Sequence, residues 1–158
     1  MNQKSYPDGL NGTVGRAAEG PCILVVDDDP EMLMIIGMSL ERLVAGQRIV
    51  VESDPRRALG LLPELRPDLV ITDMAMPGLD GAALARAIVG NPELSGTQLI
   101  GVTGMTEADV RETAFDSGIA EMIQKPFTPH ELRASVCRAL GIPDDRLNPF
   151  RRPGSRWS

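Results

Sequence analysis

Short apolar runs, each about the length of a strand, alternate along the chain with segments whose apolar residues recur every three or four positions. The runs are almost continuously apolar, which is typical of strands covered on both faces, as in parallel sheets. The sequence therefore predicts five strands of one parallel sheet, over Ile23–Val26, Ile49–Val51, Leu69–Thr72, Leu99–Val102 and Ile119–Ile123.

The segments between the runs predict helices, so the chain consists of five strand–helix units. In the last segment, Leu132, Val136 and Leu140 share one helical face. Capping signals mark two helix starts, and we expect Asp29 and Asp80 to cap the first and third helices. The helices are predicted from Pro30, from Pro55, over Gly81–Val89, from Thr106 to a stop at Gly118, and from about Thr128 to Leu140.

The length of 158 residues suits one domain with a proper core. Residues 1–20 and 141–158 contain many glycines and prolines and few large apolar residues, so we expect flexible extensions there. Residues 21–140 then form the predicted α/β domain. Hydrophobic residues make up 42% of the chain and charged residues 24%, which is ordinary for a soluble globular protein.

The formal net charge of −6 makes the chain as a whole poorly suited to binding a nucleic-acid backbone. No apolar run approaches the ~20 residues of a membrane helix, and polar residues follow Lys4 where a secretory signal would be apolar. Cys22 and Cys137 lie far apart within apolar patterns, so we expect buried, reduced thiols. These features favour a cytoplasmic protein.

Acidic residues follow two of the predicted strands. Asp27 and Asp28 come directly after the first strand, and Asp73 follows the third. In open parallel sheets, ligands bind beyond the carboxyl ends of the strands, and Thr103 and Lys125 follow the fourth and fifth strands there. Carboxylates packed together repel one another, so such a site predicts a hard cation, Mg²⁺.

These residue types are suited to phosphoryl transfer. A carboxylate can attack phosphorus and form an acyl phosphate. Beyond that attack, phosphoryl transfer needs mainly positioning and neutralisation of charge. The ammonium group of Lys125 can neutralise one phosphoryl oxygen, and the hydroxyl of Thr103 can donate a hydrogen bond to another.

Four motifs occur in order, each at the end of a predicted strand: Val25-Val26-Asp27-Asp28; Asp73 with Met76-Pro77 and Asp80-Gly81; Thr103-Gly104; and Lys125-Pro126-Phe127. Over about residues 21–140 the chain thereby resembles the receiver domain of bacterial two-component response regulators. The resemblance implies a flavodoxin-like, doubly wound fold, in which five helices flank a five-stranded parallel sheet of order 2-1-3-4-5.

The resemblance also implies a role for each site residue. Asp73 is expected to be the phosphoacceptor, with Thr103 and Lys125 contacting the phosphoryl group. Asp28 is expected to bind Mg²⁺ directly and Asp27 partly through water. The resemblance further implies that Asp73 and the Ala75 carbonyl complete the metal site, and that the Lys125–Pro126 bond is cis, against a base rate of ~5%.

Two departures from the family pattern concern the switch and the lifetime of the phosphoryl group. Where the family usually has Tyr, Phe or His, three residues before the lysine, this chain has Met122. Methionine is flexible and unbranched, so Met122 is a candidate switch residue together with Thr103. Ala75 and Met105 flank the site and cannot hold or activate a water molecule, which predicts slow self-dephosphorylation.

We therefore expect a single-domain response regulator rather than an enzyme, one that catalyses only its own phosphotransfer and autodephosphorylation. Its phosphodonor is expected to be a sensor histidine kinase or a histidine phosphotransfer protein. By the resemblance, a downstream protein binds the surface at about Thr106–Leu140. The 18 residues after Leu140 are too few for a DNA-binding module, so none is expected.

Three alternatives remain open at this point. The chain could be a phosphorelay intermediate that passes the phosphoryl group on, or a receiver-like scaffold that never uses phosphate, which only Met122 supports. A haloacid-dehalogenase-like phosphatase also uses an aspartyl phosphate. That family needs a second aspartate two residues after the nucleophile, where this chain has Ala75.

Two further features invite a functional interpretation. His130, in His130-Glu131-Leu132-Arg133, resembles the phosphorylated helix of histidine kinases, but it opens the predicted last helix and is interpreted as a surface residue. The tail ends in a basic segment that includes an aromatic residue. We interpret it as a solvated end, with a docking peptide as the alternative; it comprises Arg146, Arg151, Arg152, Arg156 and Trp157.

Overall fold

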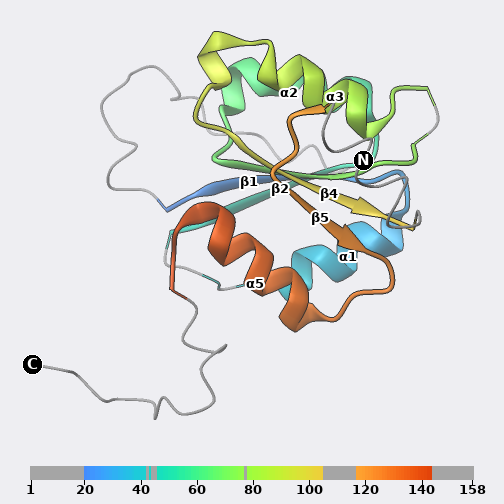
Figure 1. The fold of residues 1–158 in the computed structure, drawn as a ribbon, viewed down its shortest axis with the longest axis vertical. Coiled ribbons are helices and arrows are strands. Elements are labelled where there is room, and N and C mark those ends of the chain that lie inside the picture. Colours follow the sequence, from blue (N-terminus) through green and yellow to red (C-terminus); the bar gives the residue numbers. More distant parts are fainter. Residues whose placement is uncertain (1–19, 42, 44–45, 77, 105–116, 144–158) are drawn as a thin grey trace, which may run out of the picture.

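The structure is a computed structural model that describes residues 20–41, 43, 46–76, 78–104 and 117–143. Within these residues, five strands form one parallel sheet of order β2-β1-β3-β4-β5 (Figure 1). The predicted strand order and direction are thereby confirmed. The strands are β1 (Cys22–Val26), β2 (Arg48–Glu52), β3 (Leu69–Asp73), β4 (Gln98–Thr103) and β5 (Glu121–Gln124).

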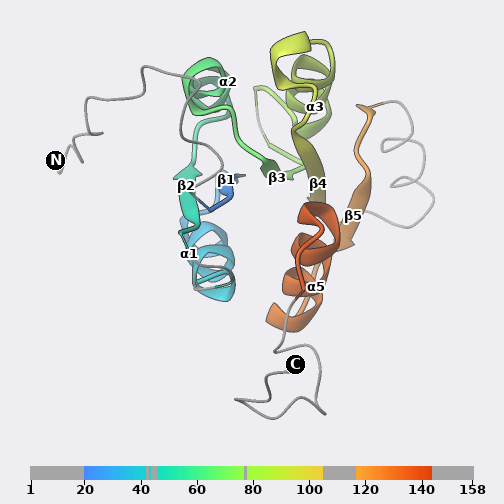
Figure 2. The ribbon, with the colours of Figure 1, turned by 90° about the vertical axis from the view of Figure 1, so that its left-hand side faces the viewer.

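The described helices cover both faces of the sheet (Figure 2). Helices α2 and α3 lie on one face, and α1 and α5 lie side by side on the other. The predicted helix that starts at Thr106 falls on residues outside the described part of the chain. The described helices are α1 (Pro30–Ser39), α2 (Pro55–Leu65), α3 (Gly81–Val89) and α5 (Pro129–Leu140), with a 3-10 turn, η1 (Pro92–Leu94).

Each face of the sheet contributes to its own apolar core, because neighbouring residues of a strand point to opposite faces. Under α2 and α3, Leu24 and Val70 pack with Leu84 and Ile88. On the other face, the core beneath α1 and α5 includes Ile23, Val25, Ile71, Ile36 and Leu132. Strands buried on both faces explain the nearly continuous apolar runs in the sequence.

The predicted helix caps at Asp29 and Asp80 are confirmed. Asp29 caps α1 by accepting a hydrogen bond from the backbone N–H of Glu31, and Asp80 caps α3 through the N–H of Ala83. At the start of α5, Thr128 and Glu131 form a reciprocal capping box. These local hydrogen bonds fix where each helix leaves the carboxyl edge of the sheet.

The strand boundaries differ from the expected ones by one or two residues. The last strand begins at Glu121 rather than Ile119, because its ladder with β4 starts at the pair Ile100–Glu121. Ile119 is nevertheless buried in the α2–α3 core. The first helix ends at Ser39, and Leu40 is its buried C-cap. Both cysteines are buried, as expected, and neither forms a disulfide bond within the described residues. None of the described helices has the length and apolar character needed to span a membrane.

Candidate functional site

The structure brings the predicted site residues together at the carboxyl edge of the sheet. Asp73 is the last residue of β3, and Asp27 and Asp28 directly follow β1, the neighbouring strand. Thr103 ends β4, and Lys125 directly follows β5. Because all five strands run in the same direction, their ends deliver these side chains to one edge of the sheet.

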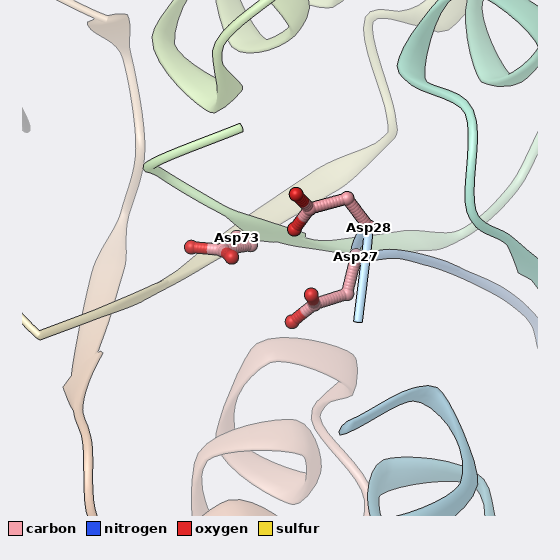
Figure 3. Close-up of side chains that lie close together, drawn as sticks. All are labelled: Asp27, Asp28 and Asp73. Atoms are coloured by element: carbon pink, nitrogen blue, oxygen red, sulfur yellow. The ribbon is translucent and has the colours of Figure 1, made fainter. Parts of the chain in front are cut away.

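The three aspartates form a compact acidic cluster (Figure 3). Each contributes one carboxylate oxygen, and these oxygens all lie within 4.8 Å of one another. Asp27 and Asp73 are buried, at 1% and 7% exposure, whereas Asp28 is exposed at the rim. The cluster therefore has two fixed members inside the fold and one that faces solvent.

Backbone N–H groups hold the two buried carboxylates in place. The N–H of Asp29 donates to Asp27 Oδ1 at 2.9 Å, and the N–H of Ala75 donates to Asp73 Oδ1 at 3.0 Å. In both cases the donor lies two residues after the acid, in the turn that leaves the strand. The turns thus orient the carboxylates and leave each second oxygen, Oδ2, for other partners.

Lys125 supplies the positive charge of the site. Its Nζ lies 3.4 Å from Asp73 Oδ2 and 3.7 Å from Asp27 Oδ2, so one ammonium group bridges two strand ends. The backbone N–H of Lys125 donates to the carbonyl of Thr103 at 2.7 Å, which fixes the loop after β5 against the end of β4. The Lys125–Pro126 peptide bond is cis, as the resemblance implied.

One ammonium group does not balance three carboxylates. The pKa of Asp27 is raised above its ordinary value, chiefly by burial and also by the charges of Asp73 and Asp28; the Asp29 N–H and Lys125 partly offset this. Among the described residues, Asp27 Oδ2 is a buried oxygen without a hydrogen-bond partner. An orphaned carboxylate oxygen in a cluster of hard oxygen ligands fits a bound Mg²⁺.

The two candidate switch residues lie on β4 and β5. Thr103 is fully buried at the end of β4. Met122, on β5, is partly buried and packs against the core beneath α2 and α3. Thr103 therefore lies at the same edge of the sheet as the acidic cluster, whereas Met122 lies on the neighbouring strand, opposite Gly101 of β4.

Gly81 is part of the site's support, a role that the sequence alone did not reveal. A Cβ atom at this position would lie 2.3 Å from the carbonyl oxygen of Asp73 and 2.9 Å from the Cα of Met74. Only glycine lets α3 begin this close to the phosphoacceptor candidate. The sequence motif Asp80-Gly81 could have indicated this role. Helix capping explains why Asp80 is present but gives no reason for Gly81.

Comparison with known proteins identifies the family. The profile of the response regulator receiver domain matches residues 23–137, which is most of the chain. The chain therefore belongs to the response regulator receiver domain family. Receiver domains are phosphoacceptor signalling domains of two-component systems that bind Mg²⁺ at an acidic pocket, and the cluster of Asp27, Asp28 and Asp73 lies in that position.

Individual relatives agree with this assignment. The DNA-binding response regulator MtrA of Mycolicibacterium smegmatis is 37% identical over 128 residues, covering 78% of this chain and 52% of MtrA. A receiver protein from Burkholderia phymatum has a TM-score of 0.69 at 32% identity and covers 80% of this chain and 99% of its own. For chemotaxis protein CheY4 of Vibrio cholerae, the TM-score is 0.69 at 25% identity, with coverage of 76% and 98%.

The chain spans about half the length of MtrA, which is described by name as a DNA-binding protein. The expectation that no DNA-binding module accompanies this receiver domain therefore stays a prediction.

Proposed function

We propose that this protein accepts a phosphoryl group on Asp73 from a phosphohistidine of a sensor histidine kinase or a histidine phosphotransfer protein. In this step a carboxylate oxygen of Asp73 forms a bond to phosphorus while the phosphorus–nitrogen bond of the donor breaks, which yields an acyl phosphate. Hydrolysis by water later releases phosphate and restores the carboxylate. The observation that carries the proposal is that Asp73 belongs to the acidic cluster and also lies 3.4 Å from the ammonium group of Lys125.

The other site residues support this step by charge and position. Asp27, Asp28 and Asp73, with the backbone carbonyl of Ala75, would hold Mg²⁺, which neutralises phosphoryl charge when bound. Lys125 Nζ, 3.4 Å from Asp73 Oδ2, is placed to pair with a phosphoryl oxygen. The hydroxyl of Thr103 would donate a hydrogen bond to another phosphoryl oxygen.

The signal would be read on the surface formed by about residues 106–140, of which residues 117–140 are described. Here an open groove of about 660 Å³ lies between β5 and α5, and its lining includes Met122, Lys125, His130 and Arg138. Lys125 belongs both to this lining and to the site, so a new charge on Asp73 acts directly on one wall of the groove. Phosphorylation would thereby bias binding of a downstream protein.

The protein would act as a signalling protein that catalyses only its own phosphotransfer and dephosphorylation. Two fates of the phosphoryl group fit this proposal: an effector keeps it until hydrolysis, and a relay intermediate returns it to another histidine. Incubating the phosphorylated protein with a histidine phosphotransfer protein distinguishes them. Loss of the label faster than by hydrolysis alone assigns the relay role.

The proposal is tested with acetyl phosphate as a small phosphodonor in the presence of Mg²⁺. Intact-mass measurement should show a gain of one phosphoryl group in the wild type and none in Asp73→Asn. Asp80→Asn is the matched control, because asparagine also caps a helix, so α3 is retained and labelling should persist. Removing Mg²⁺ with EDTA should abolish the gain in every variant.

Two outcomes would overturn the proposal. A mass gain that persists in Asp73→Asn would place the acceptor elsewhere. A wild type that gains no mass from acetyl phosphate, although calorimetry shows that it binds Mg²⁺, would favour the phosphate-independent scaffold.

A further inference from the structure

Helix α1 presents an apolar face to solvent. Met34, Ile35 and Met38 are exposed by 60%, 45% and 69%, although the opposite face of the same helix, with Leu33 and Ile36, is buried against the sheet. A surface helix ordinarily turns charged or polar residues outward. Contiguous exposed apolar residues mark interaction sites. We call Met34, Ile35 and Met38 the α1 stripe.

The stripe is continuous and lies between acidic residues. Met38 follows Met34 by four positions and Ile35 by three, so the three side chains adjoin on one helical face. Exposed Glu31 lies three and four positions before Met34 and Ile35, and exposed Glu41 follows the helix. Residues 20–41 contain five acidic residues, of which Asp27 and Asp28 belong to the acidic cluster, and no basic one; the next basic residue along the chain is Arg42.

Arg133, a basic residue of the neighbouring helix α5, does not neutralise the acidic charge around the stripe. Arg133 of α5 is buried, and its Nη1 donates to the carbonyl oxygen of Ser39 at the end of α1 at 3.0 Å. The guanidinium group of Arg133 therefore binds the end of α1 and is not available to pair with an acidic residue on the surface. A second copy of the chain would place a like-charged stretch against the first, which is unfavourable. The stripe instead suits a segment that is both basic and aromatic.

The chain itself contains such a segment. Residues 146–158 hold four of the 16 basic residues, none of the 22 acidic ones, and two aromatic residues, Phe150 and Trp157. The preceding 145 residues therefore carry a formal charge of −10, against −6 for the whole chain. The charge of this tail is complementary to that of the residues around the stripe.

The segment is also attached within reach of the stripe. Helix α5 ends at Leu140, and α1 lies beside it on the same face of the sheet (Figure 2). The 17 residues from Ile142 to Ser158 span up to about 56 Å when extended. Helix α1, with 10 residues, is only about 15 Å long. The tail can therefore reach every residue of the stripe.

We propose that residues 144–158 bind the α1 stripe of their own chain. The indole ring of Trp157 contacts the thioethers of Met34 and Met38, since sulfur–aromatic contacts are favourable, and the arginines face Glu31 and Glu41. Attachment to α5 gives the tail a millimolar effective concentration at the stripe. The tail thus acts as an intramolecular cover that any protein docking on α1 must displace.

Trp157 is the only tryptophan, so its fluorescence reports on the tail alone. In the intact protein we expect emission at shorter wavelength, and weaker quenching by acrylamide, than in a synthetic peptide of residues 144–158. Met38→Glu should return both values to those of the peptide. The control is Val89→Glu on α3, because Val89 is 62% exposed but lies on the opposite face of the sheet; it should change neither value.

A second variant tests the charge term while leaving the stripe intact. Arg151→Glu with Arg152→Glu should move the emission toward that of the peptide, and about 1 M salt should do the same in the wild type, because it shortens the screening length to about 3 Å. Far-UV circular dichroism verifies that each variant is folded. None of these measurements involves phosphate, so they succeed or fail independently of the function proposed for Asp73.

The proposal is overturned if the intact protein and the peptide give the same emission and quenching, or if Met38→Glu and Val89→Glu behave alike. It is also overturned if the blue shift grows with protein concentration and sedimentation shows a dimer, because the cover is then a second copy of the chain.

Discussion

Met122 occupies the space that a side chain on Gly101 would fill. The two residues are register partners on β5 and β4, and the Sδ of Met122 lies 2.3 Å from the position of a Cβ on Gly101. The Sδ of Met74 lies 3.0 Å from the same position. Two flexible thioethers therefore share the space beside Gly101. The absence of a side chain on Gly101 leaves room for Met122 to pack against the core beneath α2 and α3.

This contact predicts that Gly101→Ala displaces Met122. Because the obstructing atoms are the far end of a flexible side chain, the thioether can move, and we expect a loss of only about 1 kcal/mol in the free energy of unfolding. The Met122 methyl resonance should shift more than that of any other methionine. Gly60→Ala, in α2 with open space around it, is the control and should gain about 1 kcal/mol.

Gly81→Ala is expected to be more damaging, because the obstructing atom is backbone. The new Cβ would lie 2.3 Å from the carbonyl oxygen of Asp73, and neither α3 nor β3 can yield as a thioether can. We expect a loss of about 3 kcal/mol in denaturant unfolding, at the upper end for overpacking, and slower labelling by acetyl phosphate. A loss no greater than that of Gly101→Ala would contradict the distinction between flexible and rigid neighbours.

The sequence predicted which side chains lie together at the carboxyl edge of the sheet, because its signals there are local. Asp27, Asp28 and Asp73 directly follow apolar runs, and parallel strands must bring such ends to one edge. The caps at Asp29 and Asp80 were equally readable, since donor and acceptor lie two or three residues apart. Features that depend on a residue and its near neighbours in the sequence could therefore be predicted from the sequence alone.

Contacts between distant segments could not be predicted in this way. The pairing of Met122 with Gly101 depends on the register of β5, whose start was placed two residues too early. The outward apolar face of α1 was hidden because apolar residues surround this helix on all sides, so periodicity did not distinguish its two faces. The burial of Arg133 depends on the packing of α5 beside α1.

Asp27→Asn is expected to make the metal-free protein more stable at neutral pH. The raised pKa of Asp27 means that its charged form is disfavoured in the fold, chiefly by burial and by the charges of Asp73 and Asp28. Asparagine can still accept the hydrogen bond from the N–H of Asp29. The free energy of unfolding without metal should therefore rise.

The same variant should lose the response to Mg²⁺. At a Mg²⁺ concentration of 100 times the dissociation constant, the wild type should gain about 2.7 kcal/mol and Asp27→Asn should gain little. Asp68→Asn serves as control: Asp68 accepts from the N–H of Cys22 at the start of β1, at the other edge of the sheet, so its variant should respond like the wild type. An equal Mg²⁺ response in all three proteins would contradict the metal assignment.

Ala75→Asn is expected to shorten the lifetime of the acyl phosphate on Asp73. Ala75 is exposed two residues after Asp73, and its N–H donates to Asp73 Oδ1, so a side chain here lies beside the acceptor. A methyl group cannot hold water, whereas an amide can. We expect roughly tenfold faster hydrolysis, equivalent to about 1.4 kcal/mol in the barrier. The decay of the phosphorylated mass after removal of donor measures it, and Val89→Asn should decay like the wild type.

Glu121 is expected to add stability that disappears in acid. Burial alone would raise its pKa, but hydrogen bonds from Arg138 and from Ser135 Oγ, the latter at 2.6 Å, outweigh burial and hold the pKa below its ordinary value of 4.5. The folded protein thus binds this proton less readily than the unfolded chain. The contribution of Glu121 is present above the unfolded pKa and is lost as the pH falls through the lowered one.

The measurement compares the free energy of unfolding of the wild type and Glu121→Gln as the pH falls from 7 toward 3. The wild type should lead at neutral pH by less than about 1 kcal/mol, because the Glu121 and Arg138 side chains are 29% and 64% exposed. This difference in free energy of unfolding should become smaller below pH 4.5. In a Ser135→Ala background, the difference in free energy of unfolding caused by Glu121→Gln should be roughly half as large, because Ser135→Ala removes one of the two hydrogen bonds to Glu121. A lead that persists undiminished in acid would show that Glu121 stabilises the fold by packing rather than by its charge.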